Sequence, residues 1–409
     1  MKNCIVAQSG GPTSVINASA MGVLEESINS HYYDNVYAGI NGIAGILNDH
    51  IVNLSSIDYD EVKGLKYTPS SGLGSCRYKL KPFEKSTEEY IKLFEILKKY
   101  EIKTFFYIGG NDSQDTVYKF SMYAKEHNED VKFIGIPKTI DNDLPIMDHT
   151  PGFGSAAKLI ATSVLENLLD ASVYHTKGVF ILETMGRDTG WLAASACIAT
   201  INGKPAADFI YLPEVAFDSE KFLKDISKKF TEKNHVFVVV SEGIRTKEGK
   251  FLSEAHATSL DKFGHTQLGG VCDYLKSLIL TTNTAEKVRV LELSTIQRSA
   301  MHCASQTDID EAFEVGKAAV TYSIDGISGN MIGIRRLSNA PYTSETFVLE
   351  ASKVANNIKY FPKEWINAEG NNVTREAYEY TLPLIMGEPK ILIENGLPKY
   401  TFFEEAFKL

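Results

Sequence analysis

Two stretches of the chain carry residue types that suit phosphate chemistry, "YIGGNDSQDT" at 107–116 and "GIPKTIDND" at 135–143. Each stretch comes directly after an apolar run, where a buried strand would end. Paired glycines in the first stretch let backbone N–H groups approach an anion without interference from a Cβ atom. Asp112 and Asp141 add carboxylates that suit Mg²⁺ binding or proton abstraction, and Lys138 adds a cation. Together these residues predict a site for a phosphate compound.

Two further loops offer similar chemistry, "SGGPTS" with Gly11 and "SGLGSCR" with Arg77. Taken alone, each feature has a simpler explanation. A glycine pair is more often a tight turn, and "DND" is typical of a solvated turn that caps a helix. A single lysine is usually a surface residue. Because the glycines, carboxylates and cations occur together, the phosphate interpretation is favoured over these alternatives.

The elements that would position these loops alternate between apolar and amphipathic runs. "NCIVAQ", "TFFYI" and "VKFIGI" are predicted strands, and each leads into one of the loops. Helix-like segments follow the first two, which is the order of α/β folds. Parallel strands joined by right-handed crossovers would bring the loops to one carboxyl edge of a sheet, where they can face one ligand. A second α/β set follows, with "GVFILE" leading to "TMGRDTG" and "HVFVVV" leading to "SEGIR". We expect the two halves to face a cleft.

The composition limits the function classes. The chain has 409 residues, of which 44% are hydrophobic, so it can form two or three folded domains. A formal net charge of -10 argues against nucleic acid or an anionic membrane as a partner. No run approaches the ~18 apolar residues of a membrane span, and the start shows no signal peptide. The five cysteines are widely spaced and are expected to be reduced. A cytoplasmic enzyme is predicted.

Eight motifs, in order and spacing, resemble the phosphofructokinase family. They are "SGGPTSVINA", "SGLGSCR", "GGNDSQDT", "PKTIDND", "PGFGSAAK", "ETMGRDTGWLA", "SEG" and "STIQR". The resemblance covers roughly residues 3–360. It implies two similar three-layer α/β domains with mainly parallel sheets facing a central cleft, plus a C-terminal extension. The expected domains are 1–147 with part of about 299–345 for the phosphoryl donor, 148–298 with part of about 346–365 for the sugar phosphate, and 366–409 for the extension.

The resemblance also implies roles for individual residues. Asp141 is similar to the base that takes the proton from the 1-hydroxyl of fructose 6-phosphate. Arg289 and Arg298 match two arginines that hold the 6-phosphate, the first usually supplied by a neighbouring subunit, and Lys177 matches another such position after a one-residue gap. A homodimer or homotetramer with shared active sites is therefore expected. The other positions that match sugar contacts are Thr139, Asp143, Met185, Gly186, Arg187 and Glu242.

The donor is predicted from two departures within the family. ATP-using relatives have glycines where this chain has Asp112 and Lys138, which would fill the space of the α-phosphate and ribose. The chain therefore resembles the pyrophosphate-dependent branch. Mg²⁺ is expected to bridge pyrophosphate and Asp112, while Gly11, Arg77, Gly110 and Lys138 bind the donor. Arg187 would steady the transferring group. The products would be fructose 1,6-bisphosphate and phosphate, in a reversible step of glycolysis and gluconeogenesis.

Two alternatives stay open at this stage. One is an ATP-dependent phosphofructokinase, and the other is a non-catalytic regulatory subunit with the same fold. Asn111, where an aspartate is familiar, favours the second and leaves the metal geometry undefined. Thr295 replaces a familiar aromatic residue or histidine before the arginine of "IQR", which removes one expected phosphate contact.

Overall fold

The computed structural model describes residues 1–253 and 270–403, which form two compact units. The first unit comprises Met1–Ser155, Arg298–Lys359 and Met386–Leu409. The second comprises Ala156–Gln297 and Tyr360–Ile385. In the described ranges no helix has the length and apolar character needed to span a membrane.

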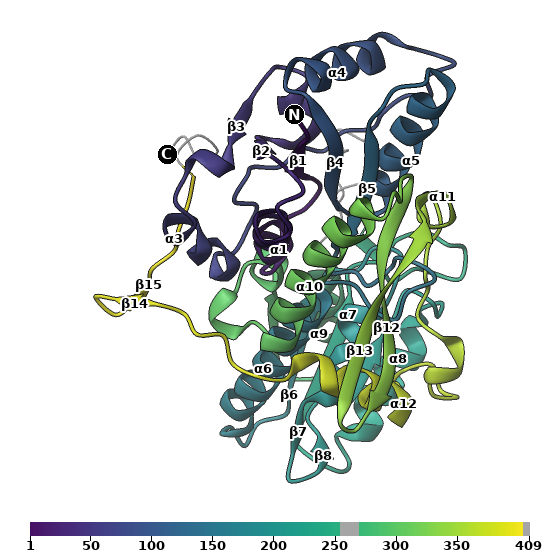
Figure 1. Ribbon diagram of the computed structural model, residues 1–409. Helices are drawn as coiled ribbons and strands as arrows, with labels where there is room; N and C mark the ends of the chain where they lie inside the picture. Colours follow the sequence, from purple (N-terminus) through teal and green to yellow (C-terminus); the bar gives the residue numbers. More distant parts are fainter. Residues whose placement is uncertain (254–269, 404–409) are drawn as a thin grey trace. The chain divides into compact units, whose positions relative to one another are not determined.

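A seven-stranded sheet forms the centre of the first unit, in the order β13-β12-β5-β4-β1-β2-β3 (Figure 1). All neighbours from β12 to β2 are parallel, and β13 and β3 are antiparallel edge strands. Its strands are β1 (Asn3–Gln8), β2 (Asn35–Gly39), β3 (Ile51–Asn53), β4 (Ile102–Gly109), β5 (Lys132–Pro137), β12 (Asn330–Asn339) and β13 (Tyr342–Glu350). Parallel pairing places the ends of β1, β4 and β5, and hence three of the predicted loops, at one edge.

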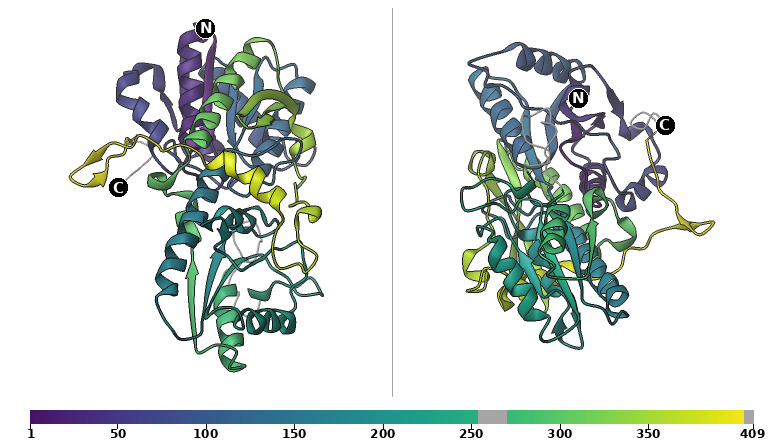
Figure 2. Two further views of the ribbon diagram at one scale, coloured as in Figure 1. Left: turned by 90° about the horizontal axis from the view of Figure 1, so that it is seen from below. Right: turned by 180° about the vertical axis from the view of Figure 1, so that it is seen from behind.

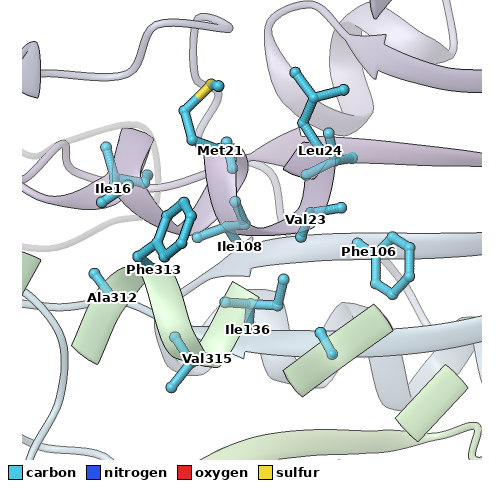
Figure 3. Close-up of a cluster of buried hydrophobic side chains, with 14 of the residues drawn as sticks. Ile16, Met21, Val23, Leu24, Phe106, Ile108, Ile136, Ala312, Phe313 and Val315 are labelled. Atoms are coloured by element: carbon cyan, nitrogen blue, oxygen red, sulfur yellow. The ribbon is translucent and has the colours of Figure 1, made fainter. Parts of the chain in front are cut away.

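Helices cover both faces of this sheet. Helices α1 (Ile16–Ser30) and α10 (Gln306–Ile324) pack on one face, where Val23 and Phe313 meet Phe106 and Ile108 of the sheet (Figure 3). The two helices approach closely because each has a glycine at the crossing: a Cβ atom on Gly22 would lie 2.1 Å from the carbonyl oxygen of Phe313. Helices α4 (Glu88–Lys99) and α5 (Asn111–Glu126) pack on the opposite face. Three layers result, each apolar face being removed from water.

Short elements complete the first unit. A hairpin of β14 and β15 lies on a C-terminal arm that projects from the unit in each view (Figure 2). The arm returns to the body at Thr401, whose N–H donates to Thr68 Oγ1 over 3.1 Å, and Phe403 is buried in the core. The short elements are α2 (Gly42–Ile46), α3 (Tyr59–Val62), α11 (Ala351–Val354), β14 (Ile393–Glu394) and β15 (Leu397–Pro398).

The second unit contains a four-stranded parallel sheet in the order β11-β6-β10-β9. Valines and isoleucines on one face of the sheet form a core with α8 and α9. The strands are β6 (Gly178–Thr184), β9 (Phe209–Tyr211), β10 (His235–Ser241) and β11 (Lys287–Glu292), with a separate small hairpin of β7 (Thr200–Ile201) and β8 (Lys204–Pro205). The helices are α6 (Phe153–Ser172), α7 (Trp191–Ala194), α8 (Ser219–Lys229), α9 (Val271–Thr281) and α12 (Arg375–Thr381).

The predicted α/β class with mainly parallel sheets is confirmed. The predicted domain limits remain a prediction; the packing units place 346–359 and 386–409 with the first unit. None of the five cysteines, all within the described ranges, forms a disulfide bond.

Candidate active site

Three loops of the first unit meet at the carboxyl ends of β1, β4 and β5. The N–H of Ser9 donates to the carbonyl of Ile108 over 2.9 Å, and the N–H of Lys138 donates to Gly109 over 3.1 Å. The "SGLGSCR" loop joins them, because Gly10 donates its N–H to the carbonyl of Cys76 over 2.9 Å. The glycine-rich loops predicted from sequence therefore form one cluster.

Lys138 lies at the centre of this cluster. Its side chain is only 3% exposed, and its Nζ donates to the carbonyl oxygen of Gly11 over 2.6 Å. Burial lowers the pKa of Lys138 to about 8, although the nearby carboxylates of Asp141 and Asp143 act in the opposite direction. A buried ammonium is stabilised by a neighbouring anion, and a bound phosphate group would supply one.

Two arginines add positive charge beside Lys138. Arg77 and Arg298 both act to lower the pKa of the Lys138 ammonium, as neighbouring cations do. Arg298 lies against Gly11, where an added Cβ atom would be 2.7 Å from its Nη1 atom. The structure thus brings Gly11, Arg77, Lys138 and Arg298 together in one unit.

The loop after β5 carries the predicted base. The N–H of Asp141 donates to Thr139 Oγ1 over 3.1 Å, and the Thr139 hydroxyl donates to Asp141 Oδ2 over 3.4 Å. Asn142 has a left-handed backbone with φ of 54° and is fully buried. Asp141 and Asp143, on either side of Asn142, are both half-buried. The carboxylate of Asp141 therefore lies near the Lys138 ammonium without being removed from solvent.

The loop after β4 begins α5, with Gly110 as its N-cap and Asp112 in its first turn. A helix amino end carries partial positive charge and favours anions. Asp112 is exposed, so its carboxylate is accessible to a cation. The side chain of Asn111 instead binds backbone groups of residues 354–357.

Asp112 fits the pattern of Mg²⁺ sites, which use one or two carboxylates together with substrate phosphates and water. Elsewhere in the described part of the chain, one group of three potential ligands lies close together, Glu183, Cys272 and Glu292. Glu183 accepts the N–H of Cys272 over 2.8 Å and Glu292 accepts the N–H of Gly270 over 3.1 Å, so these carboxylates already have partners. A thiol is also a poor Mg²⁺ ligand.

In the second unit the loops after β6 and β10 meet. Glu242 Oε1 accepts the N–H of Gly186 over 3.2 Å, and the N–H of Glu242 donates to the carbonyl of Thr184 over 2.9 Å. Gly186 has φ of 128°, a conformation that a side chain would strain. The N–H of Met185 donates to Gln297 Oε1 over 3.1 Å. Met185, Gly186, Arg187 and Glu242 therefore converge, as their common assignment to the sugar requires.

Lys177 and Arg289 lie at the other end of the same sheet. Lys177 directly precedes β6, and Arg289 pairs with Phe180 near the start of β6. A strand of seven residues spans roughly 20 Å, so these cations are remote from Met185 and Glu242 of the same chain. Arg289 binds Asp170 over 2.6 Å and stacks on Tyr174 at 4.7 Å.

Sequence reasoning missed two basic residues that hold the Asp141 loop, the buried His149 and the half-buried Lys359. His149 donates to Asp148 over 2.7 Å and to Glu311 over 2.6 Å. Lys359 donates its Nζ to the carbonyl of Asp148 over 2.8 Å. The signal for His149 was its place in "MDHTPG" on the predicted base loop, whereas Lys359 is more than 200 positions away from that loop.

Comparisons with known proteins find relatives over most of the chain. The family model described as Phosphofructokinase matches residues 3–322. A pyrophosphate–fructose 6-phosphate 1-phosphotransferase from Methylococcus capsulatus is 42% identical over 404 residues, covering 98% of this chain and 95% of its own. One from Halomonas elongata is 40% identical over 400 residues, covering 97% and 95%. The crystal structure of a pyrophosphate-dependent phosphofructokinase from Nitrosospira multiformis is 38% identical, with a TM-score of 0.88 and coverage of 97% and 95%.

A family match over more than half of the chain, joined to relatives of this identity, defines the class of protein. The chain belongs to the phosphofructokinase family.

Proposed function

We propose that the protein transfers a phosphoryl group from pyrophosphate to the 1-hydroxyl of fructose 6-phosphate, reversibly, giving fructose 1,6-bisphosphate and phosphate. The observation that carries the proposal is the buried ammonium of Lys138 on the Gly11 carbonyl. It lies 3.2 Å from the position of a Cβ atom on Gly10, so it fills space beside the glycine loop. A compact donor with charge at both ends suits this site, and a nucleotide would need that space.

In the first unit each group has a separate task. Asp141 accepts the proton of the sugar 1-hydroxyl, and Thr139 orients its carboxylate. Lys138, Arg77 and the N–H groups of Gly11 and Gly110 neutralise the charge of pyrophosphate. Asp143 is assigned to the sugar. Arg298 is assigned to the 6-phosphate of the sugar. Its side chain lies beside Gly11, so this arginine is also close to the loops proposed to bind pyrophosphate.

Asp112 would hold Mg²⁺, with the donor's phosphate oxygens and water as its other ligands. When bound, the ion would neutralise charge that develops on the bridging oxygen of pyrophosphate. Asp112 also repels the α-phosphate of a nucleotide, which favours the shorter donor.

The second unit supplies the sugar contacts. Glu242, Met185 and Gly186 form its sugar-binding loops, and Arg187 steadies the transferring group. Lys177 and Arg289 are assigned to the 6-phosphate in the site of a neighbouring chain, because they lie at the opposite end of the sheet from these loops. The apolar residues Leu169 and Val173, 58% and 70% exposed, lie at and just after the last turn of α6, the helix whose Asp170 binds Arg289, and support an interface there. A homodimer or homotetramer in the cytoplasm follows.

Initial rates of fructose 1,6-bisphosphate formation, with pyrophosphate or ATP as the sole donor, test the proposal. We expect turnover with pyrophosphate alone, and we expect Lys138→Met to lower kcat/KM for pyrophosphate by about 100-fold. The matched control is Lys103→Met, which removes an exposed lysine at the amino end of β4. Turnover with ATP alone would identify an ATP-dependent enzyme, and no turnover with either donor would indicate a regulatory subunit.

A further inference from the structure

The segment 354–359, "VANNIK", begins at the last residue of the short helix α11 and contacts two loops of the candidate site. None of its residues was assigned a role in the reaction. We call it the strap. It runs past the amino end of α5, which carries Asp112, and then past the loop that carries Asp141.

At its first end the strap binds the side chain of Asn111. Asn111 Nδ2 donates to the carbonyl oxygens of Val354 over 3.2 Å and Asn357 over 2.5 Å. Asn111 Oδ1 accepts the N–H of Asn356 over 2.5 Å. A second link joins Asn356 Nδ2 to Asp115 Oδ1 over 3.1 Å. An aspartate at 111 could not donate to the two carbonyls, so the amide suits this contact and a carboxylate does not.

At its other end the strap binds the Asp141 loop through Lys359. The backbone N–H of Lys359 donates to the carbonyl of Asp143 over 2.7 Å. Its Nζ donates to Asn142 Oδ1 over 3.1 Å, to Asp148 over 2.8 Å and to Met147 over 3.4 Å. An ammonium has three protons, and here they point to one side chain and two backbone carbonyls of a single loop. The loop has irregular backbone at Asn142 and Ile146, so it depends on such bonds for its shape.

The cation of Lys359 is costly to keep in this position. Burial lowers its pKa to about 7, although the carboxylates of Asp148 and Asp143 oppose the change. A lysine that only filled space could be replaced by an apolar residue at no electrostatic cost. The three bonds of its Nζ to one polar loop therefore explain the lysine better than space filling does.

We propose that the strap fixes the spacing between the Asp112 loop and the Asp141 loop, with Asn111 and Lys359 as positioning residues for phosphoryl transfer. Asn111 is next to Asp112, which would bind Mg²⁺. Lys359 binds Asn142 and Asp143, which are one and two residues after Asp141, the group that would accept the proton. In-line transfer needs donor and acceptor within a few tenths of an ångström of the reactive geometry, and a shift of about 1 Å can cost about 100-fold in rate. The inference rests on the proposed function.

Lys359→Met and Asn111→Ala test the strap separately and together. Each single variant is expected to lower kcat by about 10- to 100-fold at saturating substrates, with KM for either substrate changed less than about threefold. Lys359→Arg, which keeps the charge, should recover part of the loss. Lys353→Met is the matched control, because Lys353 lies beside the strap but pairs at the surface with Glu350 and should leave kcat unchanged.

The double variant distinguishes positioning from simple support. Both anchors hold the same segment, so the second substitution should lower kcat less once the first has released the strap. The fold loss of kcat in the double variant should therefore be smaller than the product of the two single losses. A combined loss equal to that product would overturn the proposal. So would single variants with wild-type kcat per folded molecule and only a lower unfolding midpoint.

Folding failure and failure of the proposed function have separate outcomes. If Lys359→Met does not fold, Asn111→Ala and Lys359→Arg still supply the kcat comparison, and wild-type kcat in both would overturn the proposal. If the wild-type protein uses ATP and not pyrophosphate, the donor assignment fails, and the same variants are then assayed with ATP, because the strap concerns loop spacing and not donor identity.

Discussion

The two units differ in the charged groups that hold their chemistry-bearing loops. In the first unit three basic side chains hold them: Lys138 and Lys359 have lowered pKa values, and His149 lies between two carboxylates. The same unit also buries the carboxylate of Asp308, which accepts the N–H groups of Gly152 and Ser155. In the second unit the groups that bind the loops are carboxylates. Burial raises the pKa of Glu183 to about 7 and also raises that of Glu214, which accepts N–H groups of Gly190 and Phe361.

This difference matches what each unit is proposed to bind. Pyrophosphate is a compact polyanion, and a protein of net charge -10 can attract it only through local positive charge. A sugar offers hydroxyl groups, which donate well to carboxylates such as Glu242. The contrast fits the proposal that the first unit binds the donor, while the sugar contacts come from both units.

The largest expected loss of activity comes from replacing Asp141, the proposed base in the first unit. Asp141→Asn should lower kcat by about 1000-fold, because the amide cannot accept the hydroxyl proton, while the amide can still occupy the place beside Thr139. Initial rates at saturating fructose 6-phosphate and pyrophosphate measure the loss. Asp130→Asn, at an exposed surface pair with Lys103, is the control. A loss below tenfold would remove Asp141 from the mechanism.

A second test uses the two ends of the second unit's sheet. Arg289→Met alone should raise KM for fructose 6-phosphate by about 10- to 100-fold, the loss of a charge-assisted contact to phosphate. If Arg289 serves a neighbouring chain, a mixture with Asp141→Asn should regain activity, because one site of each hybrid has both residues intact. For a randomly reassembled dimer assayed at a fructose 6-phosphate concentration well below the raised KM, the recovery should be about a quarter of the wild-type rate at that concentration.

The mixture must be unfolded and refolded together, and its rate compared with the sum of the two variants assayed apart. Recovery above that sum requires sharing between chains. A rate equal to the sum, with hybrid oligomers demonstrated by a size tag on one variant, would mean that Arg289 acts within its own chain or not at all.

The sequence predicted much of this arrangement, for physical reasons. Strand ends and glycine loops are local signals, so β1 and the loops around Asp112, Lys138 and Asp141 could be placed before the fold was known. The segment that begins in "PGFGSAAK" forms the long helix α6, whereas "WLAASACIAT" forms only a short α-helix followed by a 3₁₀ turn. The second segment is mostly apolar, so its pattern does not show where a helix would end.

The buried cations could not be predicted in the same way. Lys359 binds a loop more than 200 residues earlier, and the partner of His149 at Nε2, Glu311, is 162 residues later. Their partners come together only through tertiary packing of β12, α10 and the strap. The local sequence around Lys359 is typical of a polar surface segment and does not predict a buried contact. Asn111 differs from the aspartate of the familiar motif, but that difference does not predict its contact with the strap.

The last prediction concerns how the free energy of unfolding depends on pH. It should affect turnover least, and it tests the charge contrast most directly. Burial alone would lower the pKa of His149, but the carboxylates of Glu311 and Asp148 overcome it and raise the pKa to about 9 from 6.5. A raised pKa stabilises the fold fully below pH 6.5, and this contribution is lost as pH rises toward 9. The raised pKa of Glu183 also makes the fold less stable as pH rises, but over a lower pH range, from 4.5 to about 7.

Each contribution is on the order of 3 kcal/mol at most. Lys138 and Lys359 act with the opposite sign, because their lowered pKa values make the fold more stable as pH rises from about 7 or 8 toward 10.5. A plot of wild-type stability against pH therefore combines contributions of opposite sign. The groups that surround His149 also matter: Arg336 binds Asp148, and Tyr342 and Ser344 donate to Glu311.

The difference between wild type and variant isolates one group. Urea unfolding from pH 5 to 9 should show that His149→Gln is less stable than wild type by an amount that shrinks between pH 6.5 and 9, whereas the difference between Glu183→Gln and wild type should change only below about pH 7. His235→Gln, on the partly exposed first residue of β10, is the control. A constant difference for His149→Gln across the range would mean that the pKa of His149 is the same in the folded and the unfolded protein, and the first unit would then lose one of the three cations on which the contrast depends.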